Sequence, residues 1–256
     1  MRRRSRRCAR RWQPLDSTTA RLAFAVDAVA FDLDGTLLDT VHDLAAAVNL
    51  LLGKLHLSPL PVDVVRDFIG KGIEDLISKA LTRARGVPPR DGEVVALLPL
   101  YQQGYTLELG RQTRLFPGVG SGLERMRAAG FKLAVITNKA TRFVRPHLEH
   151  AGIADFFEVV IGGDDAIAKK PSAEPLLLAA TQLGVSAPHM LMVGDSVNDV
   201  RAARAAGSPV VVVPYGYNEG VPVQTLAADG IVDSLEAIAD WIKHRSAPDF
   251  GSSKSS

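Results

Sequence analysis

An alternation of strand-like and helix-like segments between residues 115 and 213 constrains the fold of this chain more than any other feature. Apolar runs of strand length recur there, and a segment with helical periodicity separates each run from the next. The runs span residues 132–136, 159–161, 190–193 and 210–213. Strict βαβα order predicts a doubly wound parallel sheet with helices on both faces, which is an α/β, Rossmann-like core.

One further apolar run, at residues 26–31, precedes this alternation and predicts another buried strand. Helical patterns follow it in place of a second strand, at residues 41–54, 62–69, 73–85 and about 93–107. Proline- and glycine-rich breaks separate these patterns. We therefore expect residues 21–39 and 113–245 to form the core. Residues 40–112 would be an inserted small helical cap domain, placed as a lid over the carboxyl ends of the strands.

Three local patterns give finer predictions. Ser121 and Glu124 have the spacing of a capping box, which predicts that a helix starts at Ser121. An amphipathic pattern predicts a last helix near residues 235–242. His147 and His150 share a predicted helix face, and no third ligand lies nearby in the sequence. We therefore expect these histidines to be solvated and not to bind a metal.

The net charge of +2 is unevenly distributed, because seven arginines fall within the first eleven residues and the remaining chain is acidic. We expect residues 1–20 to be a disordered Arg-rich tail and residues 246–256 to be a disordered polar tail. An arginine cluster can also bind nucleic acid or anionic lipid, or resemble a transit peptide. We favour the plain tail, and we expect no nucleic-acid partner.

Cys8 is the only cysteine in the sequence, so the chain has no internal disulfide and no cysteine metal cluster. This composition fits a reducing compartment, and we expect a cytoplasmic protein. No apolar run approaches the roughly 18 residues that a membrane helix needs. No apolar segment of the signal-peptide kind follows the arginines. We therefore expect no membrane partner, and we predict no particular oligomeric state.

Polar side chains follow strand after strand in the predicted sheet. They are Asp32 and Asp34, then Thr137 and Asn138, then Lys169 and Lys170, and finally Asp195 and Asp199. Because the carboxyl ends of parallel strands form one rim, we expect these side chains to lie around a common crevice. Like charges this close resist joint ionisation unless a cation lies between them. The pair formed by Asp32 and Asp34 therefore suggests a metal site, a proton-sharing dyad, or a nucleophile beside an acid.

This set of groups suits phosphoryl transfer. Carboxylates bind hard cations such as Mg²⁺, and a hydroxyl, free N–H groups and a lysine can hold phosphate oxygens. Each segment also has an ordinary structural explanation: an Asp-Gly turn, an N-cap at Thr137, a solvated lysine loop, or acidic caps at Asp195 and Asp199. Because all four segments occur in order, each after a strand, we favour a shared phosphoryl-transfer site.

These segments resemble the motifs of the haloacid dehalogenase-like hydrolase superfamily. The four motifs stand in order as DLDGT at 32–36, TN at 137–138, KKP at 169–171 and GDSVND at 194–199. Within the superfamily the chain is most similar to the phosphoglycolate phosphatases. The segments that carry this similarity are ITNK at 136–139, VIGGDD at 160–165, KKPSAEPLLL at 169–178, GDSVNDVRAARAAG at 194–207 and YGYNEG at 215–220. The resemblance implies hydrolysis of 2-phosphoglycolate to glycolate and phosphate.

The resemblance also implies roles for the first two motifs. Asp32 would be the nucleophile that becomes phosphorylated. Asp34 would act first as general acid and then as general base, and would contact the metal through its backbone carbonyl. Thr137 would bind the transferring phosphoryl group, helped by the backbone of Asn138.

For the last two motifs the resemblance implies that Lys170, which directly precedes Pro171, neutralises developing charge and steadies Asp32. Asp195 would complete a Mg²⁺ site with Asp32 and Asp34. Asp199 would be a second acidic partner that orients Lys170 or a metal-bound water.

Substrate choice is expected to depend on the cap. Phosphoglycolate carries a carboxylate as well as a phosphate, and Gly70-Lys71-Gly72 offers close backbone approach and a positive charge. We therefore predict that Lys71 contacts the leaving-group end of the substrate, the alternative being a solvated hinge lysine.

Two rival interpretations of the function also include a phosphorylated aspartate. One is another small-molecule phosphatase or a phosphosugar mutase, and the other is a receiver-like signalling switch, which the helical insertion disfavours.

Overall fold

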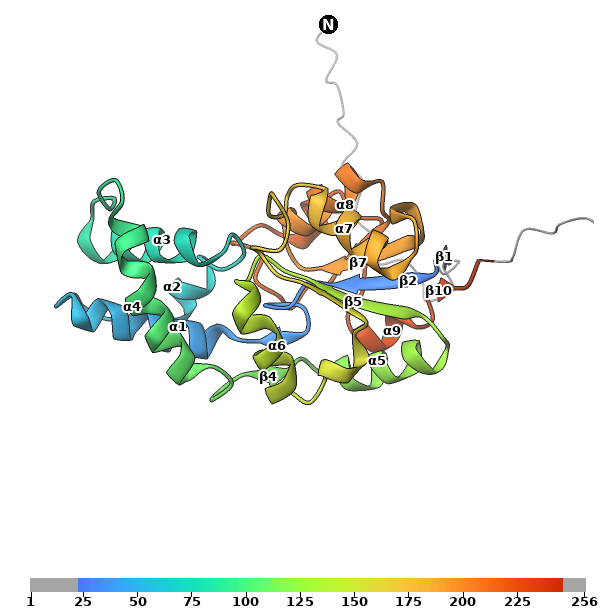
Figure 1. Ribbon diagram of the computed structural model, residues 1–256, viewed down its shortest axis with the longest axis horizontal. Helices are drawn as coiled ribbons and strands as arrows, with labels where there is room; N and C mark the ends of the chain where they lie inside the picture. Colours follow the sequence, from blue (N-terminus) through green and yellow to red (C-terminus); the bar gives the residue numbers. More distant parts are fainter. Residues whose placement is uncertain (1–22, 246–256) are drawn as a thin grey trace, which may run out of the picture.

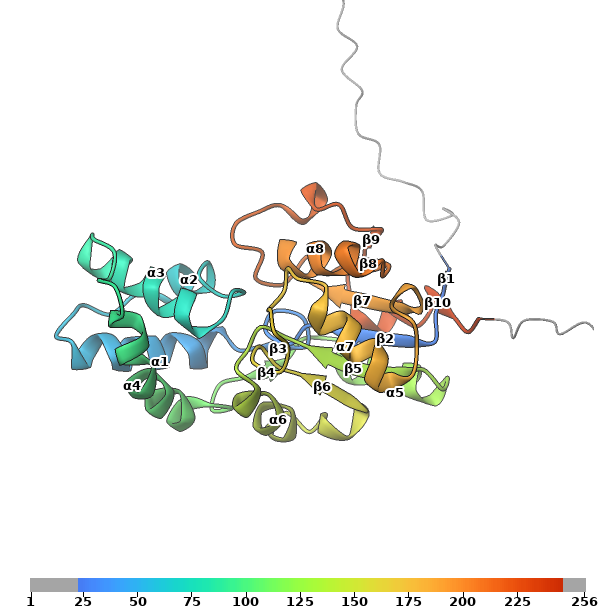
Figure 2. The same cartoon turned by 45° about the horizontal axis from the view of Figure 1, so that its top comes forward.

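The computed structural model describes residues 23–245, so both predicted tails and Cys8 lie outside the described residues. Its main sheet has six parallel strands in the order β6-β5-β2-β7-β8-β9 (Figures 1 and 2). The strands are β2 (Ala28–Phe31), β5 (Lys132–Ile136), β6 (Val159–Ile161), β7 (Met190–Gly194), β8 (Val210–Val212) and β9 (Gly230–Ile231). The α/β class and the parallel sheet predicted from the alternating pattern are confirmed.

Helices cover both faces of this sheet (Figures 1 and 2). The helices on one face are α5 (Val119–Ala128), α6 (Thr141–His150) and α9 (Leu235–Ile238), and those on the other are α7 (Glu174–Leu183) and α8 (Val197–Ala206). Side chains of β2 alternate between the two layers, so that Val29 and Phe31 pack against the first set while Ala28 and Ala30 pack against the second. The chain leaves β2 toward β5 and later returns to its other side at β7. The carboxyl ends of β2 and β7 therefore border the switch-point crevice of the fold.

Four of the five helices between β2 and β5 form a separate group beyond the carboxyl ends of the strands (Figures 1 and 2). They are α1 (Val41–Lys54), α2 (Val62–Arg66), α3 (Ile73–Arg85) and α4 (Glu93–Glu108). They share an apolar core of their own, which includes Tyr101 and Tyr105. The segments that enter and leave this group pair as two short antiparallel strands, β3 (Leu38–Asp39) and β4 (Arg114–Leu115). We call these four helices the cap, and the domain limits at residues 40 and 112 stay a prediction.

Two predicted elements are wrong in detail. Helix α5 begins at Val119, directly after Gly118 in the left-handed conformation (φ 80°), and Ser121 lies inside the helix instead of capping it. The last helix ends at Ile238, because the following residues form β10 (Ile242–Lys243), which pairs with β1 (Phe24–Ala25). The amphipathic pattern could not show this pairing, since its partner strand lies at the other end of the described chain.

A buried polar cluster joins the cap to the core. Asp43, in the first turn of α1, accepts hydrogen bonds from Gly110 N (2.8 Å), Gln112 N (2.8 Å) and Thr113 Oγ1 (2.7 Å). His147 Nε2 lies 2.9 Å from Thr113 Oγ1, which already donates to Asp43, so Nε2 carries the proton and donates. The expectation that His147 is solvated is wrong: its side chain is fully buried, and burial lowers its pKa. Asp43 thereby fixes both ends of the cap segment relative to each other.

Replacing Asp43 with asparagine should lower the free energy of unfolding at pH 7. Burial alone would raise the pKa of Asp43, but the His147 ring, with Nε2 3.9 Å away, and hydrogen bonds from Thr113 and backbone N–H groups lower it from 3.8 to about 2. The depressed pKa means that the ionised carboxylate stabilises the fold above pH 4, by about 2 kcal/mol. This contribution is lost as the pH falls from about 4 toward 2. Urea unfolding of the wild type and Asp43→Asn between pH 7 and pH 3 measures it. A deficit in Asp43→Asn that does not shrink in acid would contradict the assignment.

Candidate active site

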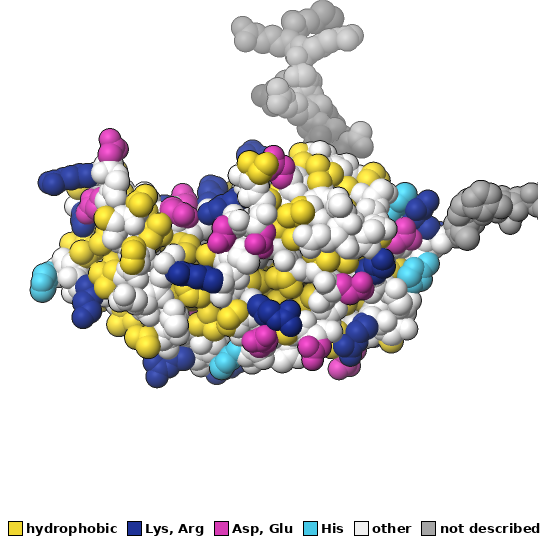
Figure 3. All heavy atoms as spheres, viewed as in Figure 1, with side chains coloured by type: hydrophobic (Ala, Val, Ile, Leu, Met, Phe, Trp, Pro, Cys, Tyr) yellow, Lys and Arg dark blue, Asp and Glu magenta, His cyan; other side chains and the backbone are white. Residues whose placement is uncertain are grey.

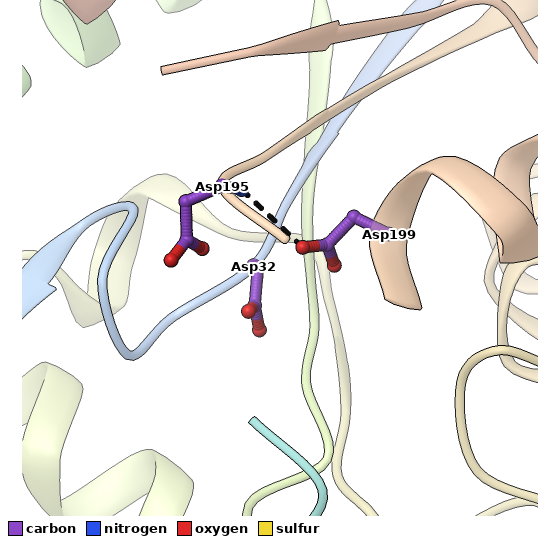
Figure 4. Close-up of side chains that lie close together, drawn as sticks. All are labelled: Asp32, Asp195 and Asp199. Atoms are coloured by element: carbon purple, nitrogen blue, oxygen red, sulfur yellow. Dashed lines mark hydrogen bonds between the residues drawn. The ribbon is translucent and has the colours of Figure 1, made fainter. Parts of the chain in front are cut away.

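Three buried carboxylates meet where β2, β7 and the start of α8 come together. Asp32 directly follows β2, Asp195 directly follows β7, and Asp199 lies in the first turn of α8 (Figure 4). One oxygen from each lies within 4.8 Å of the others, and all three side chains are buried. The predicted convergence of Asp32 and Asp195 at one rim is therefore present in the structure, and Asp199 joins them.

Lys170 brings one positive charge to this cluster. Its Nζ donates to Asp199 Oδ1 (2.6 Å) and to the carbonyl of Ile136 (2.7 Å), and lies 2.9 Å from Asp32 Oδ1. Asp32 Oδ1 accepts no well-directed hydrogen bond from the described residues. One lysine among three carboxylates leaves an excess of negative charge. This excess shows in the pKa values: burial, opposed by Lys170, raises the pKa of Asp32 to about 6. Burial and the charges of Asp199 and Asp32 raise the pKa of Asp195 well above its usual range.

The donor set fits a hard divalent cation. Asp195 is held by Thr36 Oγ1, which donates to Oδ1 (2.8 Å), and by the backbone N–H of Tyr217, which donates to Oδ2 (2.5 Å). A Cβ at Gly35, where φ is +94°, would collide with Asp195, so glycine allows the turn after Asp34 to approach this carboxylate closely. Asp32 Oδ1 supplies a buried oxygen that lacks a directed hydrogen bond. A cation would compensate the charge and use these oxygens.

Asp199 has a different environment. Its Oδ2 accepts from Ser196 Oγ (2.7 Å) and Ser196 N (3.1 Å) as part of a capping box, while Oδ1 accepts from Lys170. Both the ordinary capping explanation and the predicted contact with Lys170 are therefore found in the structure. Because Oδ1 is paired with the ammonium group of Lys170 and Oδ2 belongs to the capping box of α8, Asp199 is placed to position Lys170 and the start of α8.

Asp34 is not one of the three clustered carboxylates, although it lines the same cavity as Asp32. It accepts hydrogen bonds from Thr40 Oγ1 (2.8 Å) and from Lys139 Nζ (3.0 and 3.2 Å to its two oxygens). Burial opposes ionisation, but the charge of Lys139 and these hydrogen bonds hold the pKa of Asp34 below its usual value. Lys139 has no role among the sequence-based predictions. The sequence feature that could have identified Lys139 as a site residue is its position directly after Thr137 and Asn138.

Thr137 and Asn138 lie between Asp32 and the cap. Thr137 is buried, and its Oγ1 accepts from the N–H of Lys139 (3.2 Å). The side chain of Asn138 donates to the carbonyls of Gly70 (2.9 Å) and Lys170 (2.9 Å) and accepts from the N–H of Lys170 (2.9 Å). Asn138 therefore ties two strand-end segments of the core to a cap loop through its side chain, where only its backbone had been assigned a role.

A cavity of about 50 Å³ lies between this rim and the cap. Its core side is lined by Asp32, Asp34, Thr137, Asn138, Lys139, Ala140 and Phe143, and its cap side by Leu44, Ile69, Gly70, Gly72, Ile73, Leu76, Tyr101 and Tyr105. The polar groups lie on the core side and the apolar groups mainly on the cap side. A small ligand would therefore place its charged end on the rim and be covered by the cap.

Lys71 does not line this cavity. Its Nζ pairs with Glu219 (2.8 Å) at the surface, and the side chain is 45% exposed. A second ion pair, between Lys169 and Glu74 (3.2 Å), also bridges core and cap. Figure 3 shows charged side chains of both signs along this junction. The contact of Lys71 with substrate stays a prediction, and in the structure this lysine joins the cap to the loop after β8.

Tyr217 connects the carboxylate cluster to the entrance of the cap. Its N–H holds Asp195, while its hydroxyl accepts from the N–H groups of Thr40 (2.8 Å) and Val41 (3.0 Å) and donates to Asp39 (2.5 Å). Sequence patterns assigned it no role, because its partners are far away along the chain. The same residue thus touches a candidate metal ligand and the segment that leads into α1.

Known proteins share this architecture. The model of the haloacid dehalogenase-like hydrolase family matches residues 29–213. A phosphoglycolate phosphatase of Nitrosospira multiformis is 47% identical over 210 residues, covering 82% of this chain and 92% of the relative. One of Thiobacillus denitrificans is 40% identical over 214 residues, covering 84% and 94%. A crystal structure described as a predicted phosphoglycolate phosphatase from Haemophilus somnus 129PT superposes with a TM-score of 0.79 at 33% identity, covering 84% and 97%.

The chain therefore belongs to the haloacid dehalogenase-like hydrolase family, and the resemblance inferred from the four motifs is confirmed. Among the described residues, no helix combines the length and the hydropathy needed to cross a bilayer.

Proposed function

We propose that this haloacid dehalogenase-like hydrolase is a Mg²⁺-dependent phosphoglycolate phosphatase that releases glycolate and inorganic phosphate. The observation that carries the proposal is the position of Asp32. Its carboxylate belongs to the cluster of three, lines a small cavity and lies beside Lys170, and its Oδ1 keeps no directed hydrogen bond. The names of the relatives support the choice of substrate. A cytoplasmic location stays a prediction.

The residues divide the reaction into two displacements. In the first, an oxygen of Asp32 attacks phosphorus, the bond from phosphorus to the bridging oxygen breaks, and Asp34 gives that oxygen a proton. In the second, Asp34 accepts a proton from a water molecule that attacks the phosphorylated Asp32 and releases phosphate. Thr40 and Lys139 hold Asp34 in its ionised form in this structure, which is the form that the second displacement needs. The first displacement requires Asp34 to take up a proton before the bond to the bridging oxygen breaks, and Asp34 then passes that proton to the leaving oxygen.

Electrostatic stabilisation is shared by several groups. Lys170 is held by Asp199 and lies beside Asp32, where it would offset the charge of the phosphoryl oxygens. Thr137 and the N–H groups after it would donate hydrogen bonds to the same oxygens. Mg²⁺, held by Asp32 and Asp195 with the backbone carbonyl of Asp34, would supply further positive charge at the phosphoryl group.

A substrate panel tests the proposal. Phosphate release should be measured for 2-phosphoglycolate, ethyl phosphate, ribose 5-phosphate and glucose 6-phosphate with Mg²⁺ present. We expect kcat/KM to favour 2-phosphoglycolate by about 100-fold or more, because the cavity is small and carries a buried cation. Similar kcat/KM values across the panel would contradict the assigned substrate while leaving a phosphatase.

A further inference from the structure

We propose that Lys139 binds the carboxylate of the leaving group and is the specificity-determining residue of this site. The inference rests on the proposed function, since it takes 2-phosphoglycolate as the substrate. The buried core lysine Lys139 would then recognise the second charge of the substrate, and the exposed cap lysine Lys71 would not.

The surroundings of Lys139 suit this role. Of the described residues that line the cavity, Lys139 is the one that carries a positive charge. Its side chain is only 5% exposed. The ammonium group contacts the two oxygens of Asp34 and the hydroxyl of Tyr105 from helix α4 of the cap (2.5 Å). A buried ammonium group attracts an anion more strongly than an exposed one, because the local dielectric is low.

The geometry of the substrate places its carboxylate close to this ammonium group. Asp34, as the proposed acid, would hydrogen-bond to the bridging oxygen of the phosphoester. One methylene separates that oxygen from the carboxyl carbon, so both carboxylate oxygens lie within about 4 Å of it. Lys139 Nζ already lies 3.0 Å from Asp34 Oδ1. A leaving-group carboxylate that enters the cavity therefore comes within reach of Lys139.

The neighbouring lysines are occupied elsewhere. Lys71 and Lys169 lie at the junction of cap and core and pair with Glu219 and Glu74, and neither lines the cavity. Lys170 is held between Asp199, Asp32 and the carbonyl of Ile136. Lys139 is paired as well, with Asp34, but it is the lysine that lines the cavity and can meet a second negative charge there. A phosphoester with an uncharged leaving group gains nothing from it, which gives a physical basis for discrimination.

The experiment compares two substrates that differ by the carboxylate. We would measure kcat and KM for 2-phosphoglycolate and ethyl phosphate with the wild type, Lys139→Met, Lys139→Arg, Lys71→Met and the control Lys169→Met. We expect Lys139→Met to reduce the kcat/KM ratio of 2-phosphoglycolate to ethyl phosphate by about 100-fold, mainly through KM. Lys139→Arg should keep most of the ratio, since it keeps the charge. Lys169→Met should leave it unchanged.

Other outcomes would overturn the inference. An equal loss for both substrates in Lys139→Met would show that Lys139 acts only through Asp34. A ratio that collapses in Lys71→Met but survives in Lys139→Met would assign recognition to the cap loop. Thermal unfolding of each variant identifies a loss of fold, and Lys139→Arg keeps the test decisive if Lys139→Met is unfolded. If the wild type does not prefer 2-phosphoglycolate over ethyl phosphate, the proposed function itself is contradicted. The wild-type measurement alone gives this result, before any variant is compared.

Discussion

Asp32→Asn is expected to reduce phosphate release from 2-phosphoglycolate by about four orders of magnitude or more, because an amide is a poor nucleophile toward phosphorus. The substitution keeps the shape of the side chain and removes one charge from a cluster of three buried carboxylates. Since burial raises the pKa of Asp32, ionisation of this group does not contribute to the stability of the fold, and we expect the variant to stay folded.

A matched control and a direct readout sharpen this prediction. Asp27→Asn makes the same chemical change at a surface residue that pairs with Arg245, and it should retain activity. Acid quenching of the wild type during turnover, followed by mass spectrometry, should find one phosphoryl group on the peptide that contains Asp32. Full activity in Asp32→Asn, or phosphate trapped on a different side chain, would contradict the nucleophile assignment.

Lys170→Met should cause the second large loss, about 10³-fold in kcat/KM, because it removes the buried charge beside Asp32. It should also lower the free energy of unfolding by about 3–5 kcal/mol, since Asp199 would then be a buried carboxylate without its partner. Urea unfolding and steady-state kinetics measure the two effects. The adjacent Lys169→Met removes a surface ion pair and should change both quantities little. Equal losses at the two positions would show that the lysine segment as a whole, and not the Nζ of Lys170, determines activity and stability.

Much of this architecture could be predicted because its signals are local. Strands 132–136 and 159–161 are short apolar runs bounded by polar or glycine-rich segments, and the structure places β5 and β6 on those residues. Asp32 and Asp195 were placed together by one topological rule, that parallel strands end at a common edge. The fold therefore follows from periodicity, and the carboxylate cluster follows from the fold.

The contacts between cap and core could not be predicted in this way. Tyr105 reaches Lys139 from α4, and Tyr217 reaches Thr40 from the loop after β8. These pairs are far apart in the sequence, and no periodic pattern encodes how a helical insertion docks on a sheet. The burial of His147 has the same cause, since its partners Thr113 and Asp43 come from the two ends of the cap segment.

The Mg²⁺ dependence of phosphate release from 2-phosphoglycolate is central to the proposed function. The most direct measurement is the rate of this release before chelation of divalent cations, after chelation, and after Mg²⁺ is added back. We predict that chelation abolishes release and that Mg²⁺ restores it, because Asp32 and Asp195 are buried with excess negative charge. Release that persists in full after chelation, or no release with Mg²⁺ present, would contradict a Mg²⁺-dependent phosphoglycolate phosphatase.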